Sequence, residues 1–140
     1  MLKNIIISAS LMLFIPVAAS AAGVAVISGT AFPKDTLTST EVKDIYLGKV
    51  EMLDGKRLKP IDLKGAAKKD FLEKVVGLNE DEYKSYWIKR VFREGGSPPA
   101  VKNAADDVIS AVKEENGMIG YISADEAKGK GDIKVLLTTK

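Results

Sequence analysis

Residues 57–76, RLKPIDLKGAAKKDFLEKVV, decide which fold the rest of the chain has to fit. Apolar side chains over residues 58–63 indicate a strand, and the Asp54-Gly55 pair upstream is a turn signal. Lys64 and Gly65 break the strand pattern. The apolar residues after the break fall on one helical face: Ala67, Phe71, Leu72 and Val75. The stretch therefore predicts a strand that passes through a glycine turn directly into a helix N-terminus.

Such a junction has two interpretations, and the sequence leaves both open. The first helical turn has free backbone N–H groups and the positive end of the helix dipole, so it can hold an anion, with Lys64 adding charge. The simpler interpretation is a connecting turn, in which Gly65 is present for its backbone freedom.

The first 21 residues have the pattern of a cleavable signal peptide. Lys3 supplies the positive start, residues 5–17 are apolar, and Ala19-Ser20-Ala21 predicts cleavage before Ala22. The alternative is an uncleaved membrane anchor, but the apolar run is short for a membrane span. No later run approaches that length, so we expect no membrane insertion after processing. The predicted location is the periplasm or the outside of the cell, and a lipoprotein is excluded because the chain has no cysteine.

Composition excludes several classes of function. Removing residues 1–21 would leave 20 Lys and Arg against 19 Asp and Glu, without a basic stripe, which argues against nucleic-acid binding. Histidine and cysteine are absent, so neither a Ser-His-Asp nor a Cys-His nucleophile can form, and a zinc site is not expected. We predict a protein that is not an enzyme, with no catalytic residues, metal or cofactor. Paired-carboxylate chemistry remains open in principle, although no acidic pair stands out.

Strand and helix patterns alternate along residues 22–140, which are long enough for one domain with a core. Strands are predicted over residues 23–28, 58–63, 118–123 and 133–137. Helices are predicted from a Thr38–Glu41 capping box to Gly48, over 66–76, over 80–93 after the cap Asn79, and from the cap Asn103 to 116–117. Residues 125–131 are a charged turn or short helical piece. The fold class is α/β: one small, three-layer-like domain with a mixed or mostly parallel sheet flanked by helices.

The helix at residues 80–93 carries a cluster of aromatic and aliphatic side chains. Tyr83, Trp87 and Val91 recur at four-residue spacing, and Tyr86, Ile88 and Phe92 widen the apolar face. The spacing is that of a helix packed on a core, and we predict that role. A ligand platform is the alternative.

Ligands of α/β sheets sit beyond the carboxyl ends of strands, beside helix N-termini. Two junctions have this character: residues 63–66, and the loop at 95–99 that leads to Asn103. The predicted anion-binding residues are Lys64, Gly65, Ala66 and Ala67 at the first junction, with Ser97 and Asn103 at the second. Gly120 lies inside a predicted strand, which predicts a close approach by another backbone or a ligand.

Three segments resemble one lobe of the periplasmic phosphate-binding proteins of ABC transporters, which are type II periplasmic binding proteins. They are TSTEVKDIYLGKV at 38–50, the F-x-x-x-V-x-G pattern at 71–77, and GMIGY at 117–121. The likeness covers most of residues 22–140, and DIYLGK and GMIGY together are moderately specific. It implies an exported solute-binding protein reduced to one lobe, with an ABC permease or a second chain that completes the cleft as partners.

The resemblance also implies a ligand site at the turn into the central helix. The family carries an arginine and a Ser-Gly-Thr stretch there, whereas residues 62–67 read DLKGAA. Lys64 replaces the arginine as a point charge, both hydroxyl donors are missing, and Asp62 would oppose an anion. The expectation is weak binding of phosphate or another oxyanion. The alternative is a periplasmic interaction module that kept the lobe fold and lost the ligand.

Overall fold

The computed structural model describes residues 23–140. The predicted signal peptide at 1–21 and the cleavage point before Ala22 lie outside the described residues. Within residues 23–140 no helix is long and apolar enough to cross a membrane.

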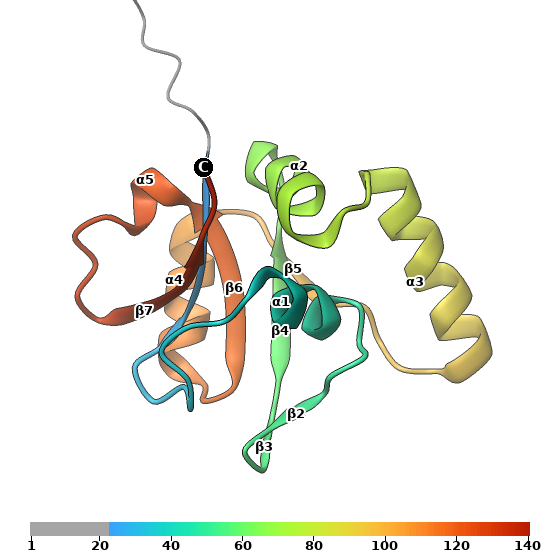
Figure 1. Cartoon of the computed structure of the whole chain (residues 1–140), viewed down its shortest axis with the longest axis horizontal. Coiled ribbons are helices and arrows are strands. Elements are labelled where there is room, and N and C mark those ends of the chain that lie inside the picture. Colours follow the sequence, from blue (N-terminus) through green and yellow to red (C-terminus); the bar gives the residue numbers. More distant parts are fainter. Residues whose placement is uncertain (1–22) are drawn as a thin grey trace, which may run out of the picture.

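The described chain folds as one α/β domain. Its elements are β1 (Val24–Gly29), α1 (Ser39–Tyr46), β2 (Met52–Leu53), β3 (Lys56–Arg57), β4 (Lys59–Leu63), α2 (Ala66–Phe71), the π-helical turn η1 (Leu72–Val76), α3 (Glu80–Glu94), β5 (Ala100–Lys102), α4 (Ala105–Glu114), β6 (Met118–Ser123), α5 (Ala124–Ala127) and β7 (Ile133–Thr138). The five-stranded sheet has the order β5-β4-β6-β1-β7, and β2 and β3 form a separate hairpin (Figure 1).

The sheet is mostly parallel, as predicted. β4 is parallel to β5 and β6, while β1 is antiparallel to both of its neighbours, β6 and β7. β4, β5, β6 and β7 therefore point the same way and end at the same edge, the upper edge in Figure 1, where α2 and α5 lie. We call this the carboxyl edge, and the opposite one the amino edge.

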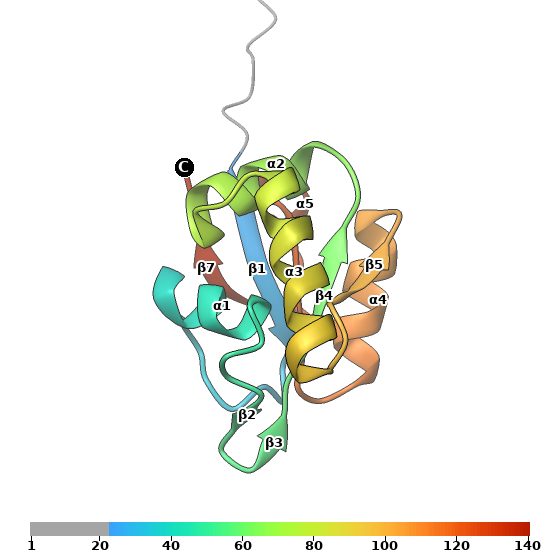
Figure 2. The same ribbon diagram turned by 90° about the vertical axis from the view of Figure 1, so that its right-hand side faces the viewer.

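Helices cover both faces of the sheet, which confirms the three-layer prediction. Neighbouring residues of a strand point to opposite faces. On β6 the Tyr121 ring stacks on Phe71 of α2 with 3.9 Å between ring centroids, whereas Gly120 faces Val108 of α4. Figure 2 shows α1 and α2 on one side of the sheet and α4 on the other, with α3 in front of the sheet. Because both faces of β1 are covered, nearly all of its side chains are buried.

Local signals set the starts of two helices as the sequence predicts. Thr38 accepts a hydrogen bond from the Glu41 N–H at 3.2 Å, and the Glu41 carboxylate accepts one from the Thr38 N–H at 2.7 Å, so the capping box of α1 is complete. The Asn79 side chain likewise accepts from the Glu82 N–H at 2.8 Å and caps α3.

Three details differ from the sequence predictions. β5 was not predicted, because its three residues form a strand only by pairing with β4. The cap predicted at Asn103 is wrong: α4 starts after Ala104, without a side-chain cap, since strand pairing holds the chain extended through Lys102. The helix predicted over 66–76 is α-helical only to Phe71 and ends as a π-helical turn at Gly77.

The apolar face predicted for residues 80–93 is wrong in part. Tyr83 and Trp87 are buried, but Ile88, Val91 and Phe92 are 61%, 40% and 91% exposed. The reason is the position of α3 at the periphery of the fold, where only one side of the helix meets the domain (Figure 1). The prediction that this cluster packs on the core therefore holds for Tyr83 and Trp87, on the inner side of α3, and not for the three exposed residues.

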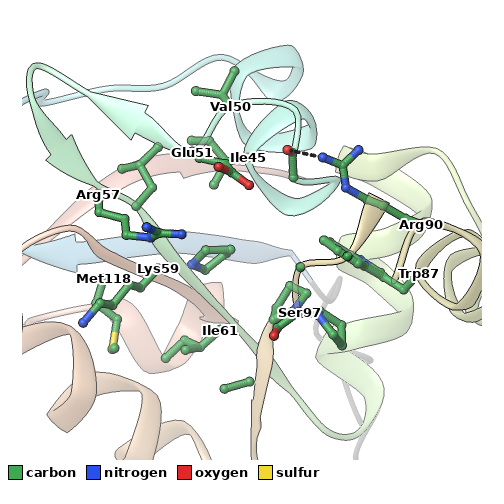
Figure 3. Close-up of a pocket in the computed structure, with 18 of the residues that line it drawn as sticks. Ile45, Val50, Glu51, Arg57, Lys59, Ile61, Trp87, Arg90, Ser97 and Met118 are labelled. Atoms are coloured by element: carbon green, nitrogen blue, oxygen red, sulfur yellow. Dashed lines mark hydrogen bonds between the residues drawn. The ribbon is translucent and has the colours of Figure 1, made fainter. Parts of the chain in front are cut away.

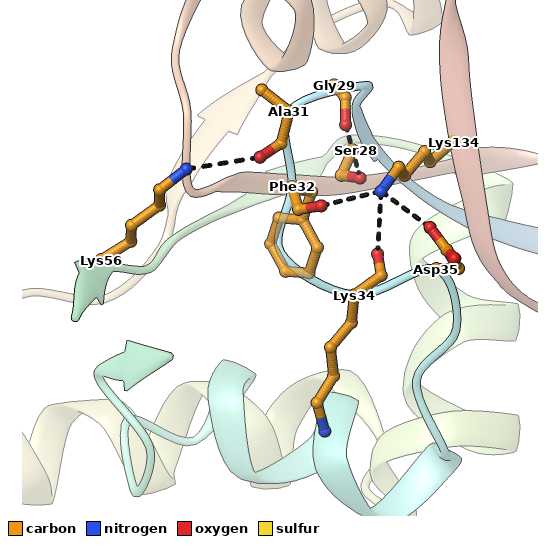
Figure 4. Close-up of polar contacts among 8 residues, drawn as sticks. All are labelled: Ser28, Gly29, Ala31, Phe32, Lys34, Asp35, Lys56 and Lys134. Carbon is orange, nitrogen blue, oxygen red and sulfur yellow. Dashed lines mark hydrogen bonds and ion pairs between the residues drawn. The ribbon is translucent and has the colours of Figure 1, made fainter. Parts of the chain in front are cut away.

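A lysine on β7 holds the loop that follows β1. Lys134 Nζ donates to the Phe32 carbonyl at 2.8 Å and to the Lys34 carbonyl at 3.4 Å, and pairs with the Asp35 carboxylate at 2.9 Å (Figure 4). This loop places Thr38 and the start of α1 over the sheet.

Candidate oxyanion site at the carboxyl edge

The predicted strand–glycine–helix junction is present at the carboxyl edge. The Lys64 N–H donates to the Lys102 carbonyl at 3.0 Å, which extends the β4–β5 pairing one residue beyond β4. Gly65 follows with φ 106° and ψ −159°, a conformation that essentially only glycine adopts. Nothing lies within 4 Å of the position of a Cβ at Gly65, so the glycine is required by the backbone angle and not by lack of space.

The N-terminus of α2 has open hydrogen-bond donors. The first backbone bond of this turn runs from the Lys68 N–H to the Gly65 carbonyl at 3.1 Å, and no side chain caps the helix. The N–H groups of Gly65, Ala66 and Ala67 precede that bond, as at any helix start. The first turn of α2 contains no acidic residue, whereas that of α4 contains Asp106 and Asp107. At α2 no acidic side chain of the first turn therefore neutralises the positive end of the helix dipole.

Lysines add positive charge to this junction. Lys64 is exposed beside Gly65, and Lys102 lies opposite Leu63 in the β4–β5 register. The Lys68 ammonium lies 5.6 Å from the centre of the Tyr83 ring. The carboxyl edge thus combines open backbone donors with cationic side chains.

Asp62 does not lie on the surface of the site. Its carboxylate is buried at the end of β4 and accepts hydrogen bonds from the hydroxyls of Tyr83 at 2.9 Å and Tyr121 at 3.0 Å. Burial raises the pKa of Asp62, against the opposing effects of the Lys68 charge and the two tyrosine hydrogen bonds. The hydroxyls of Tyr83 and Tyr121 hold the Asp62 carboxylate inside the domain, behind the turn between β4 and α2. Its repulsion of an anion bound on the outer side of that turn is therefore reduced.

Burial and the Asp62 charge also raise the pKa of Tyr83 and of Tyr121, so both hydroxyls stay protonated donors. Tyr121 accepts the Leu63 N–H at 3.2 Å as well. The network thereby ties the end of β4 to β6 and to α3, and it fixes the turn that follows. The sequence prediction missed it, because a tyrosine in a helix and another in a strand carry no signal of a shared partner.

The structure separates the six predicted site residues. Lys64, Gly65, Ala66 and Ala67 lie together at the carboxyl edge, and Asn103 follows Lys102 at the same edge. Ser97 precedes β5 and lies at the amino edge, since β5 runs parallel to β4 between Ser97 and Asn103. Ser97 and Asn103, which the sequence places at one junction, therefore lie at opposite edges of the sheet.

Ser97 lines a pocket of about 540 Å³ at the amino edge (Figure 3). Glu51, Arg57 and Trp87 line the same pocket. Arg90 borders it and is held by the Gly48 carbonyl at 2.8 Å and by Glu94 at 3.2 Å. The acidic and basic side chains are mixed here, so this pocket has no clear preference for an anion.

No family model and no curated protein matches this chain. Solved structures do match, each over 82% of this chain: a Clostridium perfringens protein described as a phosphate ABC transporter substrate-binding protein with bound phosphate (20% identity, TM-score 0.64), an ABC-type phosphate transport receptor of Vibrio cholerae (17%, 0.62) and PstS of Borrelia burgdorferi (16%, 0.59). This chain covers 44%, 45% and 47% of those chains, respectively, which is less than half of each.

The comparisons confirm the resemblance at the level of the fold. The described chain has the architecture of a single lobe of phosphate-binding proteins, and these structural neighbours are described as binding or transport proteins. At 16–20% identity the likeness establishes the fold.

Proposed function

We propose that this chain is an exported solute-binding-type protein that binds phosphate or another small oxyanion weakly at the turn between β4 and α2. The observation that carries the proposal is the uncapped start of α2, whose donors at Gly65, Ala66 and Ala67 lie beside Lys64 and Lys102. The proposed role is binding and not catalysis, since histidine and cysteine are absent.

The chemistry is that of a helix N-terminus. Oxyanion oxygens accept hydrogen bonds from the three backbone N–H groups, while the two lysines supply charge and the exposed Asn103 amide supplies a further donor. Affinity is expected between about 1 mM and tens of micromolar. Side-chain hydroxyl donors are missing, and one lobe leaves the anion in contact with water. Binding should weaken as salt is added, because the charges are close to solvent.

Amide NMR during titration with phosphate, and separately with sulfate, tests the site. Shifts are expected at residues 62–68 and 102–105 and not at Ser97. Lys64→Ala should weaken binding. Lys49→Ala changes an exposed lysine three residues after α1 and should leave binding unchanged. Saturable shifts around the amino-edge pocket would move the site, and no saturable shift up to about 50 mM of either anion would refute oxyanion binding.

Export and transport belong to the same proposal. Periplasmic location and removal of residues 1–21 rest on the sequence pattern, and an intact mass of periplasmic protein tests them. A mass that still includes residues 1–21 would contradict cleavage. An ABC permease and a second chain that completes the cleft are the proposed partners, and co-purification with a permease would test the first.

A second candidate function is a periplasmic interaction module that retains the lobe fold without a ligand. The exposed apolar side chains of α3 favour it, because surface of this kind is typical of protein contacts. The anion titration separates the two functions, since an interaction module predicts no saturable shift.

A further inference from the structure

The pocket at the amino edge lies between two walls that are far apart in the sequence. One wall is the segment that forms the β2–β3 hairpin, which supplies Glu51 and Arg57. The other is α3 with the loop after it, which supply Trp87 and Ser97 (Figure 3). Apolar residues complete the lining, including Ile45, Leu58, Ile61 and Met118. With about 540 Å³ the pocket has the size of a small-molecule site.

Most of the charged side chains at this pocket already have partners within the chain. Arg90 donates to the Gly48 carbonyl at 2.8 Å and pairs with Glu94 at 3.2 Å. Lys59 pairs with Glu115 at 2.6 Å. These contacts satisfy the charges of Arg90, Glu94 and Lys59, so they serve the walls of the pocket and not a ligand.

Glu51 and Arg57 are the two charged residues of the lining without such a partner. Neither side chain forms an ion pair within residues 23–140, with each other or with another group. One acidic and one basic group therefore line the same pocket with their charges open to a ligand.

The backbone fixes the points from which these two side chains extend. Leu58 is buried, donates its N–H to the Glu51 carbonyl at 2.9 Å and directly follows Arg57. Gly117 packs so closely on the Arg57 carbonyl that a Cβ at position 117 would clash with it. Because the wall is held in this way, less freedom is lost when the two side chains close on a ligand.

We propose that this pocket binds a small zwitterion, namely an α-amino acid with an apolar side chain. Its ammonium group pairs with the Glu51 carboxylate, and its carboxylate accepts two parallel hydrogen bonds from the Arg57 guanidinium. Both charged groups of an α-amino acid are attached to one carbon, and Glu51 and Arg57 likewise come from neighbouring positions of one wall. The apolar side chain lies against Trp87. This site is at the opposite edge of the sheet from the proposed oxyanion site and does not depend on it.

The balance of charge selects a zwitterion over a simple anion or cation. A carboxylic acid without an amino group brings its negative charge to Arg57 but also close to Glu51. An amine without a carboxylate meets the reverse situation. Each of these ligands gains one attraction and one repulsion, whereas the zwitterion gains two attractions.

Trp87 reports on the occupancy of the pocket, because it is the only tryptophan of the chain and lines the site. Titration with L-leucine and with L-phenylalanine, followed by calorimetry and, for leucine, by tryptophan fluorescence, should give a saturable signal. 4-Methylpentanoate lacks the amino group of leucine and 3-methylbutylamine lacks its carboxylate, so each should bind about tenfold or more weakly. Phosphate should not compete with leucine.

Two results of these titrations would overturn the proposal. No saturable signal up to about 50 mM of either amino acid would exclude the site. A single-charge analogue that binds as tightly as leucine would show that the pocket does not recognise a zwitterion.

Variants of the hairpin segment test the two assigned residues. Glu51→Gln and Arg57→Gln should each weaken leucine binding about tenfold or more. Asp54→Asn and Lys56→Gln remove the same charges from the same segment but outside the pocket lining, and they should change the affinity less than about twofold. Far-UV circular dichroism checks that every variant is folded. Equal losses in the pocket variants and in these controls would refute the assignment.

Discussion

Replacing Tyr83 with phenylalanine removes one hydroxyl from the polar network behind the β4–α2 turn and leaves the buried ring in place. That hydroxyl donates to the Asp62 carboxylate at 2.9 Å, and both residues are buried. A hydrogen bond to a charged group contributes about 1.5–3 kcal/mol to stability. We therefore expect Tyr83→Phe to lower the free energy of unfolding by about 2 kcal/mol.

Tyr121→Phe should cost more. The Tyr121 hydroxyl donates to the other carboxylate oxygen at 3.0 Å and accepts the Leu63 N–H at 3.2 Å. Its removal also leaves a buried backbone donor unpaired, which costs about 1–3 kcal/mol more. The ranking of the two variants is thus a test of the geometry, since both lose the same chemical group.

Urea unfolding at equilibrium measures both effects, provided that the slope with denaturant is unchanged. The cycle of Tyr83→Phe with Asp62→Asn tells whether the carboxylate is the cause. With a neutral amide at position 62, the cost of Tyr83→Phe should fall by about 1 kcal/mol. A Tyr83→Phe cost below about 0.5 kcal/mol, or an equal cost in the Asp62→Asn background, would refute the reasoning.

The other predictions concern titration, packing and backbone conformation. The pKa of Asp62 is raised in the folded state, so its contribution to stability is present below its unfolded pKa and is lost as pH rises from about 4 through the folded pKa. The free energy of unfolding of the wild type, relative to that of Asp62→Asn, should therefore fall over this pH range. A difference between the two proteins that does not change with pH would contradict this prediction. Gly120→Ala should cost about 1–3 kcal/mol, since its Cβ would lie 2.5 Å from Val108 Cγ1, whereas Gly131→Ala has open space and should be nearly neutral by the same urea assay. Gly65→Val should lower stability by about 1–3 kcal/mol and also weaken phosphate binding, because its φ of 106° suits only glycine; a change in neither quantity would count against the site. Trp87→Ala should cost about 3–5 kcal/mol and its exposed neighbour Ile88→Ala about 0.5 or less, and equal losses in dilute protein would mean that α3 is rotated.

Short-range patterns allowed much of the fold to be predicted. The capping box at Thr38, the cap at Asn79 and the turn at Gly65 act within a few residues, so their effect can be derived without knowing what lies across the molecule. The alternation of strand and helix patterns led in the same way to an α/β class with helices on both faces. The absence of histidine and cysteine narrows the possible chemistry by composition alone, because no arrangement of the chain can supply a side chain that it lacks.

Contacts between distant segments decided the rest. β5 exists because three residues pair with β4, and that pairing carries Asn103 to the carboxyl edge and leaves Ser97 at the other. Asp62 is buried between Tyr83 and Tyr121, which lie 21 and 59 residues away along the chain. Ile88 and Phe92 have the spacing of core residues, yet they face solvent because the domain meets only the inner side of α3. Spacing establishes which residues share a face, but the neighbours supplied by the tertiary fold determine whether that face is buried.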